Sequence, residues 1–158
     1  MGSSDLHVEH LDRAVALATA NVAHSGGPFG AVLVTPDGQA FDGVNRVTST
    51  NDPTAHAEIV AIRGACAALG VFDLRGSVLY ASCEPCPMCL AASLWARVGG
   101  IWCAADRYDA ARAGFDDATF YDVFTSGAGR ELPVQHHRTP SSLEPFDAWR
   151  ALDSRTAY

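Results

Sequence analysis

The sequence predicts an α/β fold in which helices cover both faces of a mixed sheet. Segments whose apolar residues recur at helical spacing alternate with short apolar runs of strand length. The first two runs are joined by a Pro-Asp-Gly turn, which is too short for a parallel crossover, so they form an antiparallel hairpin. The later runs alternate with helix-length segments, which is the pattern of a three-layer α/β/α domain.

The N-terminal part contains one helix and the hairpin. Apolar residues at three- and four-residue steps place one face of a helix over residues 6–24, and the Ser-Gly-Gly-Pro segment that follows ends it. A buried strand is expected over 29–35 and a second strand over 40–47, on the two sides of the Pro-Asp-Gly turn.

The rest of the chain alternates helices and strands. Cap-forming residues and an early proline in the segment 51–54 predict a helix start, and an Ala-rich stretch extends this helix to Gly70. The remaining expected elements are a strand over 77–82, a helix over 85–97, a strand over 101–105, two helical pieces over 110–125, a polar edge strand over 134–138 and an amphipathic helix over 145–152.

Composition restricts the kind of protein. At 158 residues, with 48% hydrophobic and 18% charged residues, the chain is expected to form a single domain over residues 1–158. The net charge is −7, and all 11 basic residues are arginine. An acidic chain without a basic cluster argues against binding to nucleic acid or to an anionic membrane, so a small-molecule substrate is favoured.

The N-terminus and the cysteines indicate a location. The N-terminus lacks a basic and apolar signal region, and no apolar run approaches the roughly 20 residues that span a bilayer, so we expect a cytoplasmic protein. Five cysteines in the cytoplasm are not expected to form disulfides, and Cys83, Cys86 and Cys89 lie within seven residues. This cluster indicates metal binding or catalysis.

Three side chains near two predicted helix starts form a candidate metal site. Cys86 and Cys89 are three residues apart, so in the first turn of a helix both sulfurs point toward one ion. The positive end of the helix dipole favours the thiolates that zinc requires, and His56 supplies a third ligand. Three protein ligands leave a fourth position open for water, as in catalytic zinc sites, so we expect one Zn²⁺ per chain.

Glu58 follows His56 by two residues and is placed beside the metal-bound water rather than on the metal. Water on zinc ionises near neutral pH, and a carboxylate next to it can move protons. The pattern His-x-Glu followed by Pro-Cys-x-x-Cys is the known signature of zinc nucleobase deaminases. The sequence therefore predicts a hydrolytic deaminase with Glu58 as the catalytic proton carrier.

Three other interpretations explain part of this pattern. A structural zinc site needs a fourth ligand, for which Cys83 is the candidate. A thioredoxin-like Cys-x-x-Cys motif leaves His56 and Glu58 without a role. A Cys/His nucleophilic hydrolase uses only one cysteine and leaves the second one unexplained.

Longer segments make the chain resemble the bacterial guanine deaminases of the cytidine deaminase-like superfamily. These segments are 26–31, 49–58, 82–89, 113–117 and 145–150, and the resemblance covers nearly the whole chain. It implies a mixed five-stranded sheet between helical layers. It also implies conversion of guanine to xanthine and ammonia, with a zinc-bound hydroxide attacking C2 and Glu58 shuttling protons.

The resemblance also assigns residues to the substrate. Asn45 takes the place of an asparagine that binds the purine, although an asparagine here also suits a loop backbone. Asp117 takes the place of an aspartate that faces the guanine amino group and assists catalysis, although a helix N-cap explains it too. Ala57, Phe29 and Trp95 are further candidate contacts, and core packing is the alternative for the two aromatic residues.

The C-terminal segment is the candidate for exchange between subunits. In the family this segment crosses to a partner subunit and closes its active site with a terminal tyrosine, which corresponds to Tyr158. The resemblance therefore implies a homodimer in which a segment of about 143–158 is swapped, whereas the sequence alone explains such a tail as frayed.

Two classes of function stay open beside guanine deamination. The first keeps the chemistry and changes the substrate to guanosine, cytosine, a triazine or adenosine in transfer RNA, of which the last needs a basic surface that this chain lacks. The second is a non-catalytic zinc-fold binding subunit. Glu58 argues against it, because such a subunit has no need of a carboxylate beside the metal.

Overall fold

A computed structural model of the chain describes residues 3–126, 135, 138–154 and 156. Its helices and strands alternate as the sequence predicts. In chain order they are α1 (Ser3–Ala23), β1 (Gly30–Val34), β2 (Ala40–Val44), α2 (Val47–Thr50), α3 (Ala57–Leu69), β3 (Val78–Cys83), α4 (Pro87–Trp95), β4 (Gly100–Ala105), α5 (Arg107–Arg112), α6 (Asp117–Ser126) and α7 (Glu144–Ala151).

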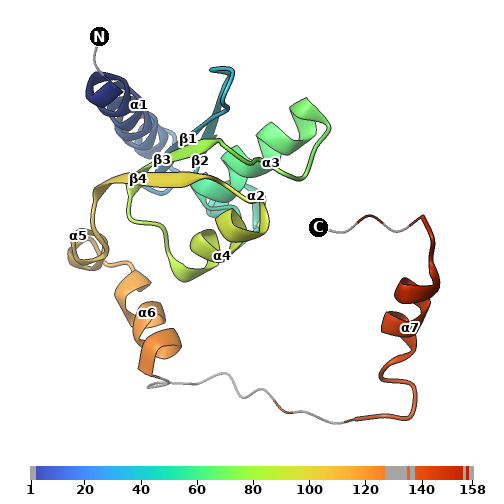
Figure 1. Cartoon of the computed structure of the whole chain (residues 1–158). Coiled ribbons are helices and arrows are strands. Elements are labelled where there is room, and N and C mark those ends of the chain that lie inside the picture. Colours follow the sequence, from blue (N-terminus) through green and yellow to red (C-terminus); the bar gives the residue numbers. More distant parts are fainter. Residues whose placement is uncertain (1–2, 127–134, 136–137, 155, 157–158) are drawn as a thin grey trace.

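The strands form one mixed sheet in the order β2-β1-β3-β4 (Figure 1). β1 runs antiparallel to both β2 and β3, and Leu33 lies opposite Phe41 on one side and Leu79 on the other. β3 and β4 are parallel and are joined by α4, as a parallel crossover requires. The hairpin and the mixed character of the sheet are therefore confirmed.

Within the described residues the sheet has four strands rather than the five that were expected. The expected fifth strand, over 134–138, falls on a segment of which only Gln135 and Arg138 are described. A second difference concerns the start of α3, which begins at Ala57 rather than in the segment 51–54. The reason is local, because Asp52 accepts hydrogen bonds from the backbone and hydroxyl of Thr54 and so forms a turn before the helix.

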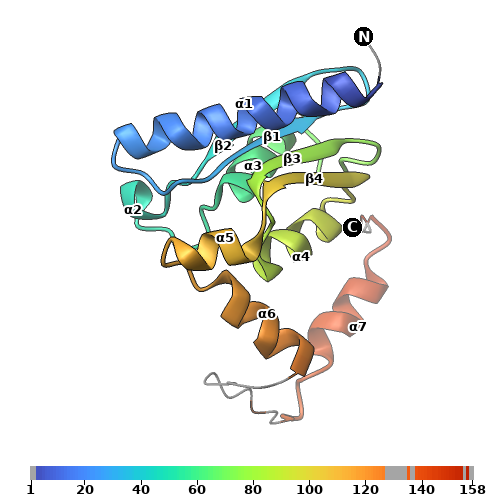
Figure 2. The same cartoon turned by 90° about the vertical axis from the view of Figure 1, so that its left-hand side faces the viewer.

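Helices cover the two faces of the sheet (Figure 2). Successive side chains of a strand point to opposite faces. Val32 on β1 therefore packs with Ala14 of α1, whereas its neighbour Leu33 packs with Ala61 of α3 on the other face. These two clusters form the core, and they confirm the three-layer α/β/α arrangement.

Close packing fixes the position of α3 against the sheet. A Cβ atom added to Gly43 on β2 would lie 2.1 Å from the carbonyl oxygen of Ala57 and 2.6 Å from the backbone nitrogen of Ala61. No residue larger than glycine fits between the strand and the first turns of this helix. The first turn of α3 therefore lies directly on β2.

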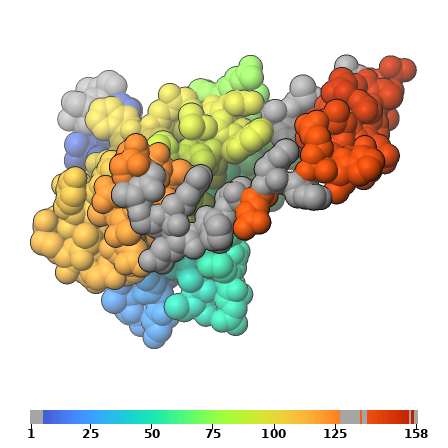
Figure 3. Space-filling view, turned by 90° about the horizontal axis from the view of Figure 1, so that it is seen from below, coloured from blue at the N-terminus to red at the C-terminus, as the bar shows by residue number. Residues whose placement is uncertain are grey.

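α7 stands apart from the layered body in all three general views (Figures 1, 2 and 3). It is separated from α1 by the sheet and by α4, and its apolar residues Phe146 and Trp149 are exposed. Among the described helices, none is both long enough and apolar enough to cross a membrane.

Candidate metal and active site

Three side chains converge where α3 and α4 begin. The Nδ1 atom of His56 lies 3.5 Å from Sγ of Cys86 and 3.6 Å from Sγ of Cys89, and the two sulfur atoms are 3.6 Å apart. A tetrahedral zinc ion with bonds of about 2.1 Å to nitrogen and 2.3 Å to sulfur places its ligands roughly 3.5–3.8 Å from one another. The triangle fits zinc, and within the described residues it is the one group of this kind.

The fold explains why these residues meet. β3 ends at Cys83, and the chain then turns into α4, whose N-cap is Cys86 and whose first turn carries Cys89. His56 is the N-cap of α3 and faces this turn. Two helix N-termini, each with a positive dipole end, therefore surround the site and favour the ionised thiols that bind a metal.

Cys83, the candidate fourth ligand of a structural site, does not join this group. Its thiol donates a hydrogen bond to the carbonyl oxygen of Asp106 at 3.3 Å. Burial and the charge of Asp117 raise the pKa of Cys83 to about 12. Because Cys83 is a neutral thiol with its own partner, it does not act as a fourth ligand. The site therefore has three protein ligands, which supports a catalytic rather than a structural zinc site.

Hydrogen bonds among the three ligand side chains shift their pKa values. The pKa of Cys86 is lowered to about 4, mainly because of its hydrogen bond with Cys89 and also because of its hydrogen bond with His56. The pKa of Cys89 is raised, because its proton is held by Cys86 and because it is buried. The hydrogen bond to Cys86 raises the pKa of His56. These contacts favour the ionised form of Cys86, which is the form that binds zinc.

Glu58 is a buried carboxyl group in the first turn of α3, two residues after the histidine ligand. Burial raises its pKa to about 7, and a hydrogen bond from the backbone only partly opposes this shift. A carboxyl group with a pKa near neutrality can both accept and donate a proton under ordinary conditions. Glu58 therefore has the properties of a general acid and base next to the metal position.

A cavity of about 300 Å³ adjoins the metal ligands. Of the residues expected at the substrate, Asn45, Asp117 and Phe29 line it together with His56 and Glu58. Seven other lining residues were not assigned to the site from the sequence, although four of them lie in the segments 26–31, 82–89 and 113–117 quoted above. They are Gly27, Val47, Thr48, Glu84, Phe115, Asp116 and Phe120.

Three further expected contacts are not among the residues that line the cavity in one chain. Ala57 is fully buried and is not among the residues that line the cavity. Trp95 ends α4, is 62% exposed and also lies outside the lining. Tyr158 lies outside the described residues. α4 places Trp95 about two turns beyond the metal ligands, so its contact with the substrate stays a prediction.

Asn45 and Asp117 face the cavity from different elements. Asn45 directly follows β2 and is buried, and its side-chain oxygen accepts a 3.3 Å hydrogen bond from the backbone of Val47. Asp117 is the first residue of α6, and burial followed by the negative charge of Cys86 raises its pKa. An amide and a carboxyl group thus offer a donor and acceptors on two sides of the same space.

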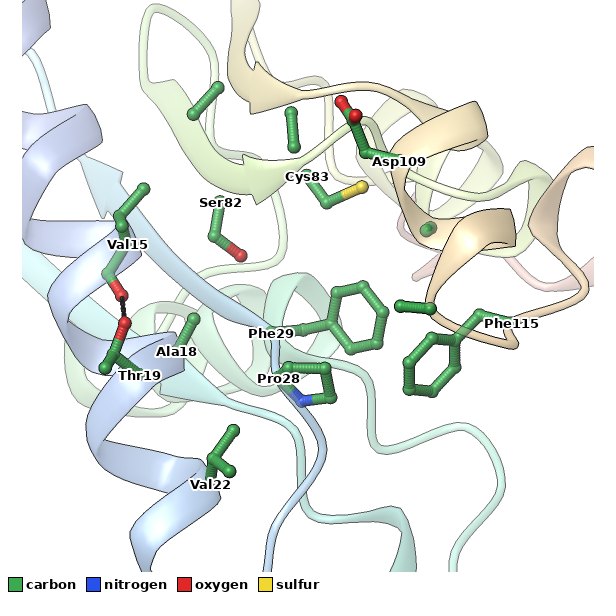
Figure 4. Close-up of a pocket in the computed structure, with 14 residues that line it drawn as sticks. Val15, Ala18, Thr19, Val22, Pro28, Phe29, Ser82, Cys83, Asp109 and Phe115 are labelled. Carbon is green, nitrogen blue, oxygen red and sulfur yellow. Dashed lines mark hydrogen bonds between the residues drawn. The ribbon is translucent and has the colours of Figure 1, made fainter.

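Two larger spaces border this cavity. An apolar one of about 470 Å³ shares His56, Cys86 and Asp117 with it and continues over α4 and α6. A groove of about 730 Å³ lies between α1, the ends of β3 and β4, and α5 (Figure 4). Phe29 and Phe115 line both the groove and the cavity, with their rings edge to face at 4.8 Å.

Comparisons with known proteins agree with this arrangement. A sequence profile of the cytidine and deoxycytidylate deaminase zinc-binding region matches residues 4–105. Guanine deaminase of Bacillus subtilis strain 168 is 47% identical over 154 residues, which are 96% of this chain and 99% of that protein. The X-ray structure of guanine deaminase from Bacillus subtilis is 45% identical and has a TM-score of 0.90, covering 100% of this chain and 99% of that chain.

Shorter matches extend the comparison. A solved structure in complex with 2,6-diaminopurine is 36% identical, with a TM-score of 0.65, over 68% of this chain and 61% of that chain. A tRNA-specific adenosine deaminase of Agrobacterium fabrum is 47% identical over 78 residues, which are 49% of this chain and 51% of that protein. The zinc-binding profile and the three-ligand group together confirm zinc as the cofactor.

Proposed function

The chain belongs to the cytidine deaminase-like zinc deaminases, within which its full-length relative is a guanine deaminase, and from this we propose that it hydrolyses guanine to xanthine and ammonia. One observation carries the proposal. The buried Glu58, the zinc ligands His56 and Cys86, and two polar groups suited to a base, Asn45 and Asp117, border a single cavity. At about 300 Å³ this cavity is at the small end of ligand pockets, as a single heterocycle requires.

Substrate binding falls to residues of different elements. The amide of Asn45 can donate to and accept from a purine edge, and the carboxylate of Asp117 can accept from the exocyclic amino group. A carboxylate in this place selects for a base that carries that amino group, because a base without it leaves the carboxylate unpaired. Phe29 supplies an apolar wall for the ring.

Proton movement falls to Glu58. Zinc, when bound by His56, Cys86 and Cys89, supplies the Lewis acidity that lowers the pKa of a water ligand to near neutrality. The Glu58 carboxylate accepts the proton of the attacking water and passes it to a ring nitrogen of the purine. Glu58 then accepts the proton of the hydroxyl group added at C2 and delivers it to the amino group, which leaves as ammonia when the C2–N bond breaks and the C2 carbonyl forms. Water and guanine are thereby consumed, and xanthine and ammonia are released.

Two features favour a free base over a base in transfer RNA. The chain carries a net charge of −7 and its basic residues form no run, whereas a transfer RNA substrate needs positive charge for its phosphates. The match to tRNA-specific adenosine deaminase also spans only about half of each protein. Guanosine, cytosine and triazines keep the same chemistry and remain the alternatives for the test.

The test is ammonia release from a panel of guanine, guanosine, cytosine, adenine and a triazine, with purified protein that contains about one zinc per chain. Guanine is expected to give the highest kcat/KM. Preference for another member of the panel would change the substrate and keep the chemistry. Retained zinc without turnover of any member would leave only the non-catalytic binding subunit.

We also propose that the single domain of residues 1–158 forms a homodimer in which a segment of about 143–158 is exchanged. Val8, Val15 and Val22 form a stripe along α1 at seven-residue spacing and are 55%, 40% and 52% exposed. Two of them, Val15 and Val22, line the groove of about 730 Å³ beside α5. The largely apolar lining of this groove suits an apolar partner.

The proposed occupant of the groove is α7 of the second subunit. α7 exposes Phe146 and Trp149, which match the apolar groove, and it lies far from α1 of its own chain (Figures 1 and 2). Burying a large apolar side chain contributes about 1.5–3 kcal/mol, so two per subunit make a substantial interface term. The residues that follow, up to Tyr158, would then close the cavity of the second subunit.

The cytoplasm is the proposed location. All five cysteines are free thiols, and the zinc site needs its two cysteines reduced. A reducing compartment keeps them so.

A further inference from the structure

Glu84 is an acidic residue of the active-site cavity that the reaction does not use. It follows Cys83 at the end of β3 and precedes the turn that carries Cys86. Its carboxylate accepts three hydrogen bonds from Arg107: from the backbone nitrogen at 3.1 Å, from Nε at 3.0 Å and from a terminal guanidinium nitrogen at 2.5 Å. Both side chains are only 26% exposed.

Tyr121 extends this contact to α6. The guanidinium carbon of Arg107 lies 3.4 Å from the centre of the Tyr121 ring, which is a close cation–π contact. The Tyr121 hydroxyl donates a 2.5 Å hydrogen bond to the carbonyl oxygen of Pro85, the residue before Cys86. The residues Glu84, Arg107 and Tyr121, called here the Arg107 clamp, therefore join α6 to the segment that carries the metal ligands.

The clamp matters for α6 because, among the described residues, little of this helix is buried. None of its ten residues is buried, and Phe120 and Phe124 are exposed. Apolar packing therefore contributes little to its position. Tyr121 lies one helical turn after Asp117, so an anchor at Tyr121 also fixes the direction of the Asp117 side chain.

An ordinary surface ion pair would not have this effect. Arg112 on the same helix as Arg107 pairs with Asp109 three residues earlier, and its side chain is 71% exposed. Such pairs within one helix contribute little and connect nothing beyond it. The Arg107 clamp differs because its guanidinium binds both carboxylate oxygens, stacks on a ring and links three separate elements.

We propose that Arg107 is a positioning residue for substrate recognition, which holds Asp117 at the cavity through Glu84 and Tyr121. The proposal rests on the proposed function, in which Asp117 contacts the base. Arg107 touches neither the substrate nor the zinc ligands. Its loss is therefore expected to loosen α6 while the metal site keeps its ligands.

The experiment measures KM and kcat for guanine in Arg107→Ala, alone and combined with Asp117→Asn, together with the zinc content of each protein. Arg107→Ala is expected to raise KM roughly 10-fold, to change kcat less than about 3-fold and to retain about one zinc per chain. In the Asp117→Asn background the same substitution should raise KM less than about 2-fold, because residues that act through each other are not additive. Arg112→Ala is the matched control and should leave KM unchanged.

Two further variants keep the test decisive if Arg107→Ala does not fold. Arg107→Lys keeps the charge without the two-pronged contact and should restore KM only in part. Tyr121→Phe removes only the hydrogen bond to Pro85 and should raise KM in the wild-type background more than beside Asp117→Asn.

Three results would overturn the positioning role of Arg107: equal KM changes in the wild-type and Asp117→Asn backgrounds, loss of zinc, or an effect on kcat alone. Wild-type protein that releases no ammonia from guanine would instead refute the proposed function, so the two failures are distinguishable.

Discussion

His56 and Cys86 occupy equivalent places, each as the N-cap of its helix. Their backbone angles are nearly the same, with φ −66° and ψ 157° for His56 and φ −65° and ψ 167° for Cys86. An N-cap residue is extended while the residue after it is helical, so its side chain projects from the helix end. Nδ1 of His56 and Sγ of Cys86 therefore lie 3.5 Å apart, and the metal site lies where the two helices begin.

Removal of one ligand at this meeting point should release the metal. Cys89→Ser is expected to lose most of its zinc and its activity, since the weaker hydroxyl ligand replaces a thiolate. Cys103→Ser is the control, because Cys103 is an exposed thiol on β4 outside the ligand group. Metal analysis after dialysis measures both. Full zinc content in Cys89→Ser would contradict the ligand assignment.

Glu58→Gln should abolish deamination without removing zinc. The amide has nearly the same shape but cannot accept the proton of water, and the loss of a general acid and base costs roughly 10²–10⁴-fold in rate. Because Glu58 is buried with a pKa near 7, a neutral side chain is tolerated there. Ammonia release and metal content measured on one sample check this, and near wild-type turnover would exclude Glu58 as the proton carrier.

Stability should depend on pH through the same residue. The folded-state pKa of Glu58, about 7, lies above the ordinary value of 4.5, so the folded protein holds the proton more tightly than the unfolded chain. Protein stripped of metal by a chelator therefore loses stability as pH rises from about 4.5 to about 7. Relative to Glu58→Gln the loss reaches at most about 3 kcal/mol. Urea unfolding of both proteins across this range measures it, and parallel curves would disprove the shift.

Asn45→Asp separates a role in binding from a role in the loop. Aspartate keeps the oxygen that accepts from Val47 but has no amide donor for the base. If Asn45 binds guanine, KM rises about 10–100-fold while the melting temperature stays close to that of the wild type. An unchanged KM with an unchanged melting temperature would assign Asn45 to the loop alone, because aspartate keeps the oxygen that binds Val47.

Charge in the groove should break the dimer. Val15→Asp places a carboxylate among apolar side chains that α7 is proposed to cover, and Phe146→Asp does the same on α7. Each should shift sedimentation toward the monomer and lower activity. Val71→Asp changes an equally exposed valine after α3, outside the groove, and should do neither. An unchanged dimer in both groove variants would contradict the exchange.

Much of this fold follows from local pattern. The hairpin turn, the helix that Gly70 ends and the Cys-x-x-Cys turn are each determined by a few neighbouring residues, and the structure contains all three. Helix starts were less predictable. Asp52 could cap a helix, but its carboxylate accepts hydrogen bonds from Thr54 instead. Whether an aspartate caps a helix or forms a turn thus depends on a contact with a residue only two positions away.

The site could be predicted only where its residues share a short motif. His56, Glu58, Cys86 and Cys89 fall in two such motifs. Glu84 directly precedes one of them, yet its role depends on Arg107, 23 residues further on, and no spacing rule predicts a contact with a residue of α5. Trp95 was expected at the base and stays a prediction, because the cavity of one chain does not include it and its helix alone does not show which cavity it faces.

Gly43 limits how this enzyme can change its substrate. The strand lies so close to Ala57 that the helix start bearing His56 and Glu58 has no space to move back. A larger heterocycle must therefore be accommodated on the opposite wall, which α6 provides through Asp117 and Phe120. Laboratory evolution toward guanosine should accordingly collect its substitutions in α6 and the groups that anchor it, while glycine persists at position 43.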